Sequence, residues 1–286
     1  MPTAILFPGQ GSQAPDMREL VERHEPELAE LALAEVGDDL FARADDGTAY
    51  AQPAILCASL AAWTAAGRPR AAFFAGHSLG EISALAAAGG IAPADAVRMA
   101  VLRGRLMQEA AAEQPGGMLA VLGDAARARA AATAGDAVVA NDNGPTQIVV
   151  AGPPEALAAT QEAARADGLR TIELAVRGAF HTPAMKPAVE PFRAALGEVE
   201  IEPPDAPVFS SVYASLFGAT ADRIRDQLAA ALVRPVRWRE TLEALHAIGV
   251  RRFVDSGPGK TLARMVSRAF DDAEAEVLRS TEAAHA

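Results

Sequence analysis

Gly76-His77-Ser78-Leu79-Gly80 is the stretch from which the fold and chemistry of this chain can be worked out. It lies between an apolar run, Ala71–Ala75, and an Ala/Leu-rich run, Leu79–Ala88, with Glu81 in its first turn. The first run suits a buried parallel strand and the second a helix. The glycines allow a sharp turn that exposes the Ser78 hydroxyl and leaves backbone N–H groups free. We therefore predict a nucleophile elbow, whereas the pentapeptide alone would also fit an ordinary glycine-rich turn.

A serine hydroxyl needs a neighbouring base to act as a nucleophile, and the chain contains five histidines. We predict His181 as the base. It follows a strand-like run, Thr171–Val176, at a point where glycine and proline interrupt the chain, so it lies at the end of an element. His77 adjoins the serine and should point away from it. Solvated or packing roles are expected for the remaining three, His24, His246 and His285.

Seven motifs follow one another along almost the whole chain. They are Phe7-Pro8-Gly9-Gln10-Gly11-Ser12-Gln13, Gln52-Pro53-Ala54, Gly76 to Glu81, Arg103-Gly104 with Met107-Gln108, Ala179-Phe180-His181, Pro235-Val236-Arg237-Trp238, and Gly257-Pro258-Gly259-Lys260. In this order they resemble the motifs of the malonyl-CoA:acyl-carrier-protein transacylases of fatty-acid synthesis and of the related polyketide synthase acyltransferases. Seven ordered motifs are far more specific than any single one.

The resemblance implies a two-step transfer of an acyl group. Ser78 would take a malonyl group from malonyl-CoA as an ester and pass it to the phosphopantetheine thiol of an acyl carrier protein. His181 would remove and return the proton in each step. The backbone N–H groups of Gln10 and Leu79 would form the oxyanion hole. No cofactor is implied, because malonyl-CoA is a substrate.

The resemblance also assigns residues that select the substrate. The Arg103 guanidinium would bind the malonyl carboxylate through two charge-assisted hydrogen bonds, although the helical pattern of Pro93–Ala112 alone would leave it facing solvent. Phe180 would fill the space that an α-methyl group needs and so favour malonyl over methylmalonyl. Gln52 and Asn143 would line the same site, with a turn-forming role as the alternative for Asn143.

The motif around Trp238 bears on the orientation of the base. In the family, the residue at the position of Arg237 usually orients the catalytic histidine through its backbone carbonyl. A backbone role survives a change of side chain, so Arg237 is expected to orient His181 in this way.

The order of predicted elements indicates an α/β fold with two parts. Residues 1–115 and 185–286 alternate strands and helices, which predicts a mostly parallel, α/β-hydrolase-like sheet covered by helices. Residues 116–184 follow the order βαββαβ, the ferredoxin-like pattern of a small inserted subdomain. The active site is expected in the cleft between the two parts.

Composition narrows the class of protein and its partners. The formal net charge of −11 disfavours nucleic acid and anionic membranes, and no apolar run reaches the roughly 18 residues of a membrane span. Met1 leads directly into a strand-like run, so we expect a cytoplasmic protein. One cysteine, Cys57, excludes an intramolecular disulfide, and no metal site is indicated. We expect a monomer.

Three classes of function remain open. The first is malonyl transfer to a carrier protein, or transfer of another acyl group in polyketide synthesis. The second is a hydrolase on the same fold that removes acyl groups from carrier proteins, which would not need Arg103. The third is a docking protein without catalysis, which the presence of Ser78, His181, Gln10 and Arg103 disfavours.

Overall fold

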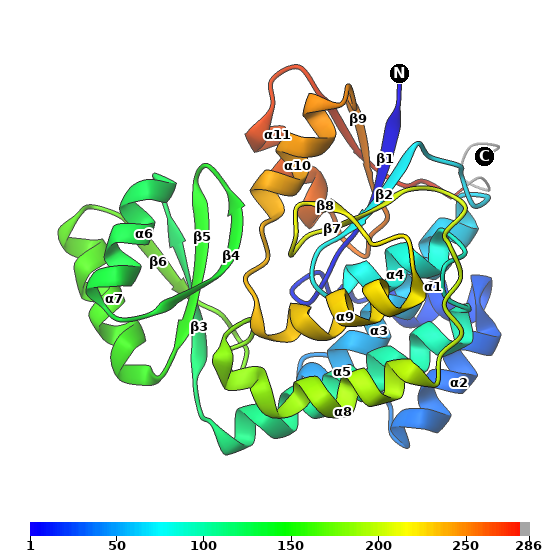
Figure 1. The fold of residues 1–286 in the computed structure, drawn as a ribbon, viewed down its shortest axis with the longest axis horizontal. Coiled ribbons are helices and arrows are strands. Elements are labelled where there is room, and N and C mark those ends of the chain that lie inside the picture. The colour runs from blue at the N-terminus through cyan, green and yellow to red at the C-terminus, as the bar shows by residue number, and fades with distance from the viewer. Residues whose placement is uncertain (281–286) are drawn as a thin grey trace.

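The computed structural model describes residues 1–280. The larger of its two sheets has six strands (Figure 1). The strands run in the order β10-β9-β1-β2-β7-β8, and only β7 and β8 pair antiparallel. The predicted mostly parallel sheet is therefore confirmed. The strands are β1 (Thr3–Phe7), β2 (Phe73–Gly76), β7 (Val208–Ser210), β8 (Ser215–Leu216), β9 (Arg252–Asp255) and β10 (Glu274–Val277).

Side chains alternate across β1, and each face packs against its own helices. Ile5 and Phe7 join the larger core, whereas Ala4 and Leu6 join a second core built with two helices near the C-terminus. Helices on both faces are expected for a parallel sheet. The larger core also contains side chains of α1 (Met17–His24), α2 (Pro26–Val36), α3 (Thr48–Ala65), α4 (Gly80–Ala87), α5 (Pro93–Glu113), α8 (Lys186–Gly197) and α9 (Ala221–Ala230), and the second core contains those of α10 (Trp238–Ala247) and α11 (Thr261–Ala269). Short 3₁₀ turns occur at Pro183–Met185 and Ala231–Val233.

A second sheet lies beside the first, on the left in Figure 1. Its four strands run in the order β4-β5-β3-β6 and all pair antiparallel. The elements follow the predicted order βαββαβ along the chain, while the domain boundaries at residues 116 and 184 stay a prediction. They are β3 (Gly117–Leu122), α6 (Ala125–Ala134), β4 (Val138–Gly144), β5 (Gln147–Gly152), α7 (Pro154–Ala166) and β6 (Arg170–Glu173).

The two parts are joined by backbone and charge contacts at β4. The Asp142 N–H donates to the Val236 carbonyl at 2.8 Å, and the Val236 N–H donates to the Ala140 carbonyl at 2.8 Å. The buried Asp142 carboxylate pairs with Arg129 at 2.6 Å and with Arg239, on α10, at 2.9 Å. These contacts fix β4 against α10 and the residues directly before it. Among the described helices, none combines the length and apolar character that crossing a membrane requires.

Candidate active site

Ser78 lies in the tight turn between β2 and α4, as the sequence predicts. Its φ of +55° is in the left-handed region, which a non-glycine residue adopts at a cost. The turn packs directly on the end of β1: the His77 N–H donates to the Phe7 carbonyl at 2.9 Å. A Cβ on Gly80 would lie 2.0 Å from that same carbonyl oxygen, so only glycine fits there. The serine side chain is therefore held above the carboxyl end of the sheet.

His181 lies beside the serine, with Nε2 2.7 Å from Ser78 Oγ. Its Nδ1 is 2.9 Å from the Ala231 carbonyl oxygen and 3.2 Å from that of Arg234. A carbonyl only accepts hydrogen bonds, so Nδ1 carries the proton and Nε2 is left to accept from the serine hydroxyl. This is the tautomer that a general base requires.

The residue expected to orient the histidine was wrongly chosen from the sequence. The Arg237 carbonyl instead accepts from the Thr241 N–H at 3.0 Å, as part of the first turn of α10. The carbonyls that accept from the imidazole come earlier in the chain, at Ala231 in the 3₁₀ turn Ala231–Val233 and at Arg234, the residue that follows this turn.

The electrostatic surroundings keep His181 neutral. Burial, followed by the positive charge of Arg103, lowers the pKa of His181 to about 3. Its side chain is 4 % exposed. A neutral imidazole is therefore present across the physiological range, ready to accept a proton.

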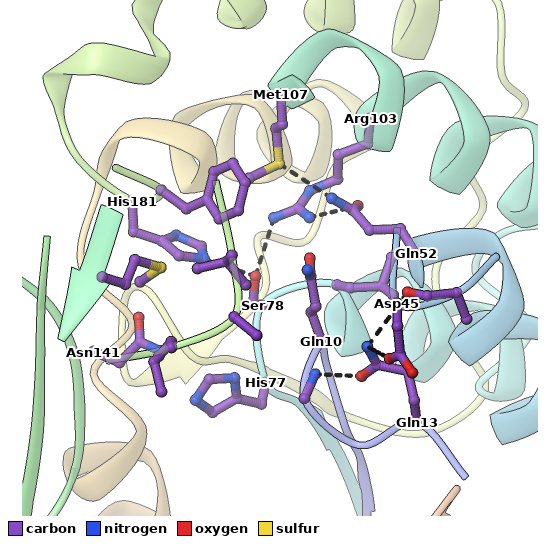
Figure 2. Close-up of a pocket in the computed structure, with 18 residues that line it drawn as sticks. Gln10, Gln13, Asp45, Gln52, His77, Ser78, Arg103, Met107, Asn141 and His181 are labelled. Carbon is purple, nitrogen blue, oxygen red and sulfur yellow. Dashed lines mark hydrogen bonds between the residues drawn. The ribbon is translucent and has the colours of Figure 1, made fainter. Parts of the chain in front are cut away.

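The other described histidines lie elsewhere, and His285 is outside the described residues. His77 points away from the serine, as predicted (Figure 2). Its Nε2 lies 2.8 Å from Asn143 Oδ1. His246 contacts Asp272 at 2.8 Å. His24 lies in the last turn of α1.

Asn143 lies at the end of β4 and not in the predicted turn, which is formed by the next residues, Pro145 and Thr146. Its amide binds His77, and the residue of this strand that lines the cavity is Asn141. The pairing of β4 with β5 shifts register between Val139 and Asn141 and again between Asp142 and Gly144, so regular alternation does not place Asn143.

Arg103 is buried, with 3 % of its surface exposed, so the solvent-facing alternative is wrong. Its Nη1 donates to Gln52 Oε1 at 2.7 Å, and its Nη2 donates to Ser78 Oγ at 3.2 Å (Figure 2). Burial lowers the pKa of Arg103 to about 10, which leaves it charged at neutral pH. Its neighbour on α5, Arg105, is exposed and lies 3.8 Å from Glu109.

Gln52 orients the Arg103 guanidinium through a hydrogen bond. Its amide Nε2 donates to Thr48 Oγ1 at 2.8 Å and to Met107 Sδ at 3.3 Å, which leaves Oε1 for Arg103. Thr48 and Gln52 lie on α3, and Arg103 lies on α5. These two helices pack side by side. The guanidinium is thus fixed before any substrate arrives.

A cavity of about 630 Å³ joins these groups. Gln10, Leu79 and Phe180 line it together with Ser78, His181 and Arg103. In the described part of the chain, neither the Gln10 N–H nor the Leu79 N–H donates to another protein group. Two backbone donors are therefore free beside the serine hydroxyl.

The loop that carries Gln10 approaches the elbow closely. A Cβ on Gly9 would lie 2.6 Å from the His77 carbonyl oxygen, so this position also requires glycine. Gln13, from the same loop, accepts from the Gly11 N–H at 2.7 Å and donates to Asp45 at 3.2 Å.

A buried polar group behind the elbow, Glu81, was not predicted as part of the site from the sequence. Glu81 is 1 % exposed, although its place in the first turn of α4 indicated only a helix-stabilising charge. It contacts Ser210, the last residue of the buried strand β7, and Ser211, the residue that follows it. Polar residues directly after a parallel strand gather at the same edge of the sheet as the site, and this signal was available in the sequence.

Among residues 1–280, no group of three or more His, Cys, Asp or Glu side chains is arranged so that it could hold a metal ion. The single cysteine packs in the core, and burial raises the pKa of Cys57 to about 12. It therefore remains a protonated, unreactive thiol near neutral pH.

Known proteins resemble this chain along most of its length. The family model described as acyl transferase domain matches residues 5–283. The malonyl CoA-acyl carrier protein transacylase of Escherichia coli strain K12 is 38% identical over 299 residues, covering 98% of this chain and 96% of that protein. The polyketide biosynthesis protein ThaF of Burkholderia thailandensis is 36% identical over 282 residues, covering 93% of this chain and 24% of its own length.

Solved structures resemble the whole chain. The malonyl-transacylase in the structure "PlMCAT:AntF (holo)", a complex with a type II polyketide acyl-carrier protein, is 34% identical with a TM-score of 0.88, covering 99% of this chain and 97% of that one. The acyl-carrier-protein-S-malonyltransferase of Bartonella henselae is 32% identical with a TM-score of 0.90, covering 99% and 96%. The chain therefore belongs to the acyltransferase family of the malonyl-CoA:acyl-carrier-protein transacylases and the polyketide synthase acyltransferases.

Proposed function

We propose that this protein transfers a malonyl group from malonyl-CoA to the phosphopantetheine thiol of an acyl carrier protein, through a malonyl ester on Ser78. The observation that carries the proposal is the position of Ser78 Oγ, 2.7 Å from His181 Nε2 and 3.2 Å from Arg103 Nη2. The nucleophilic oxygen of Ser78 therefore contacts both a base and a buried cation. This arrangement suits a substrate that pairs an acyl carbon with a carboxylate.

The first step forms the ester. The malonyl-CoA thioester carbonyl enters beside Ser78, with its oxygen toward the N–H groups of Gln10 and Leu79. His181 Nε2 accepts the serine proton as Oγ attacks the carbonyl carbon. The tetrahedral oxyanion then collapses, the carbon–sulfur bond breaks, and His181 returns the proton to the leaving CoA thiolate.

Arg103 links substrate choice to the state of the base. In the unliganded site its charge helps to hold down the pKa of His181. A malonyl carboxylate paired with the guanidinium offsets that charge, so the imidazolium that forms during attack is opposed less strongly. An acetyl group, which has no carboxylate, would leave the repulsion in place. The arginine thereby favours malonyl in the transition state as well as in binding.

The second step repeats the chemistry with the carrier thiol as nucleophile. His181 Nε2 removes the thiol proton, the sulfur attacks the ester carbon, and Ser78 Oγ leaves and takes the proton back. The complex of a related transacylase with its carrier protein supports such a partner. We propose that the reaction uses no cofactor. We also propose that the protein is a cytoplasmic monomer.

Phe180 limits the size of the acyl group. It is 6 % exposed and lines the cavity directly before His181. The ring occupies space beside the bound acyl carbon, where a branch at the α-carbon would have to fit. Discrimination by one methyl-sized contact is worth about 1–3 kcal/mol, so the site should prefer malonyl over methylmalonyl by a moderate factor.

The hydrolase alternative makes a different prediction for the acyl-enzyme. A transferase must keep water less reactive than the thiol, so the malonyl ester should persist with malonyl-CoA alone and discharge when holo carrier protein is added. The measurement follows CoA release and intact protein mass over time with malonyl-, methylmalonyl- and acetyl-CoA. Apo carrier protein, which lacks the thiol, is the control. CoA release that is equally fast with and without holo carrier would favour the hydrolase instead.

A further inference from the structure

Glu81 is a buried carboxylate directly behind the nucleophile elbow. Its side chain lies at the start of α4 and is 1 % exposed. Its Oε1 accepts from Ser210 Oγ at 2.8 Å, from the Ser211 N–H at 2.7 Å and from Ser211 Oγ at 3.2 Å. A carboxylate is costly to bury, and none of these partners carries a charge. The reaction described above does not use it.

The contacts continue from Glu81 to the nucleophile. The Ser211 hydroxyl donates its proton to Glu81, so its oxygen is left to accept, and the Ser78 N–H donates to it at 3.4 Å. That N–H belongs to the residue with φ of +55°, whose backbone is strained. Ser211 is held on its other side as well, because its carbonyl accepts from the Arg237 N–H at 2.6 Å. A short chain of hydrogen bonds therefore restrains the Ser78 backbone.

We propose that Glu81 is a positioning residue for Ser78: as a carboxylate it orients the Ser211 hydroxyl, and Ser211 in turn holds the strained Ser78 backbone so that Oγ faces His181. The neutral acid would accept these hydrogen bonds more weakly. A displaced Oγ would lose its short contact with Nε2, and misplacement of a reacting group by about 1 Å can cost 10²-fold in rate. This inference rests on the proposed chemistry at Ser78.

The charge state of Glu81 changes within an accessible pH range. Burial raises the pKa of Glu81 to about 7, against the smaller lowering effects of its serine hydrogen bonds and of the Arg103 charge. The carboxylate form therefore increases as the pH rises through 7. Positioning of Ser78 should improve in the same direction.

The ionisable groups closest to Glu81 come from the elements that pack against α4. The neighbouring strands β1, β2 and β7 carry no ionisable side chains, and α3 contributes Tyr50 and the high-pKa Cys57. Arg103 on α5 stays charged. Burial lowers the pKa of His181 to about 3, so it stays neutral, and burial also lowers the pKa of His77.

The test measures the rate constant of acyl-enzyme formation from malonyl-CoA between about pH 5.5 and 8.5, by rapid quench and intact mass. For the wild type we expect the rate to rise through an apparent pKa near 7, the value of Glu81. Glu81→Gln should be slower by roughly 10- to 100-fold at pH 8 and should lose this rise, with little change in the half-saturating concentration of malonyl-CoA. The exposed Glu30→Gln serves as the matched control.

Two further variants separate positioning from general stability. Ser211→Ala removes the oxygen that accepts from Ser78, so it should slow the reaction about as much as Glu81→Gln, and the double variant should be no slower than either. Ser210→Ala removes a hydrogen bond that lowers the pKa of Glu81. The increase of the acylation rate with pH should therefore move to higher pH. If Glu81→Gln does not fold, the Ser211 and Ser210 variants test the same chain of contacts.

The outcomes distinguish this inference from the proposed function. A wild-type protein that forms no ester on Ser78 overturns the proposed function. An ester that forms normally while Glu81→Gln keeps the wild-type rate and the rise near pH 7 overturns only the role of Glu81. If the acylation rate of Glu81→Gln still increases with pH, another group causes the increase, such as Asp255, whose pKa burial raises to about 6.

Discussion

Ser78→Ala should form no malonyl-enzyme, and His181→Ala should form it at least about 10³-fold more slowly, because an unassisted serine hydroxyl is almost never ionised near neutral pH. The loss should be one of rate and not of folding, since both side chains meet over a cavity. The measurement is rapid quench of each variant with malonyl-CoA, followed by intact mass.

The control for the histidine is His24→Ala, in the last turn of α1. It should react at the wild-type rate. A malonyl adduct of normal amount on Ser78→Ala would mean that another residue carries the acyl group.

Arg103→Ala should lower kcat/KM for malonyl-CoA by about 30-fold to a few thousandfold. Removing one partner of a buried, charged, hydrogen-bonded pair costs roughly 2–5 kcal/mol. The loss should be selective, because acetyl-CoA has no carboxylate and its slow reaction should hold steady or increase. Arg103→Lys should restore malonyl transfer only in part, because an ammonium cannot reproduce the planar pair of donors.

The matched control lies two residues away on the same helix. Arg105 is exposed and its salt bridge to Glu109 is long, so Arg105→Ala should change neither donor's reaction. An equal loss of malonyl and acetyl transfer in folded Arg103→Ala would show that Arg103 serves the structure and not carboxylate binding.

Local patterns predicted the elements around the nucleophile well. The glycines on either side of Ser78 and the two apolar runs gave the strand, the turn and the helix, because each depends on residues close in sequence. The βαββαβ order of the small sheet was readable for the same reason. The boundaries differ by a few residues, as in β6, where the predicted strand ran on to Val176 but ends at Glu173.

Contacts between distant parts of the chain could not be read from local patterns. The helical pattern alone left Arg103 facing solvent, because the groups that bury it come from α3 and the elbow. Only the resemblance to a family placed it in the site. Glu81 looked like an ordinary acid at a helix start, and its serine partners lie about 130 residues away along the chain.

The resemblance itself failed at one backbone detail. The carbonyls that orient His181 belong to Ala231 and Arg234, whereas the motif pointed to Arg237. A motif conveys side-chain identity, but the carbonyl that reaches a ring nitrogen depends on the path of a 3₁₀ turn. Such a path is set by packing, which no short motif encodes.

The most direct test of the account is to locate the acyl group after mixing the wild-type protein with malonyl-CoA in the absence of carrier protein. The quenched protein would be digested and its peptides sequenced by mass spectrometry. We predict one malonyl group per chain, on Ser78, which disappears when holo carrier protein is added before the quench. A malonyl group on any other residue, or malonyl transfer to carrier protein with no ester on Ser78, would contradict the account.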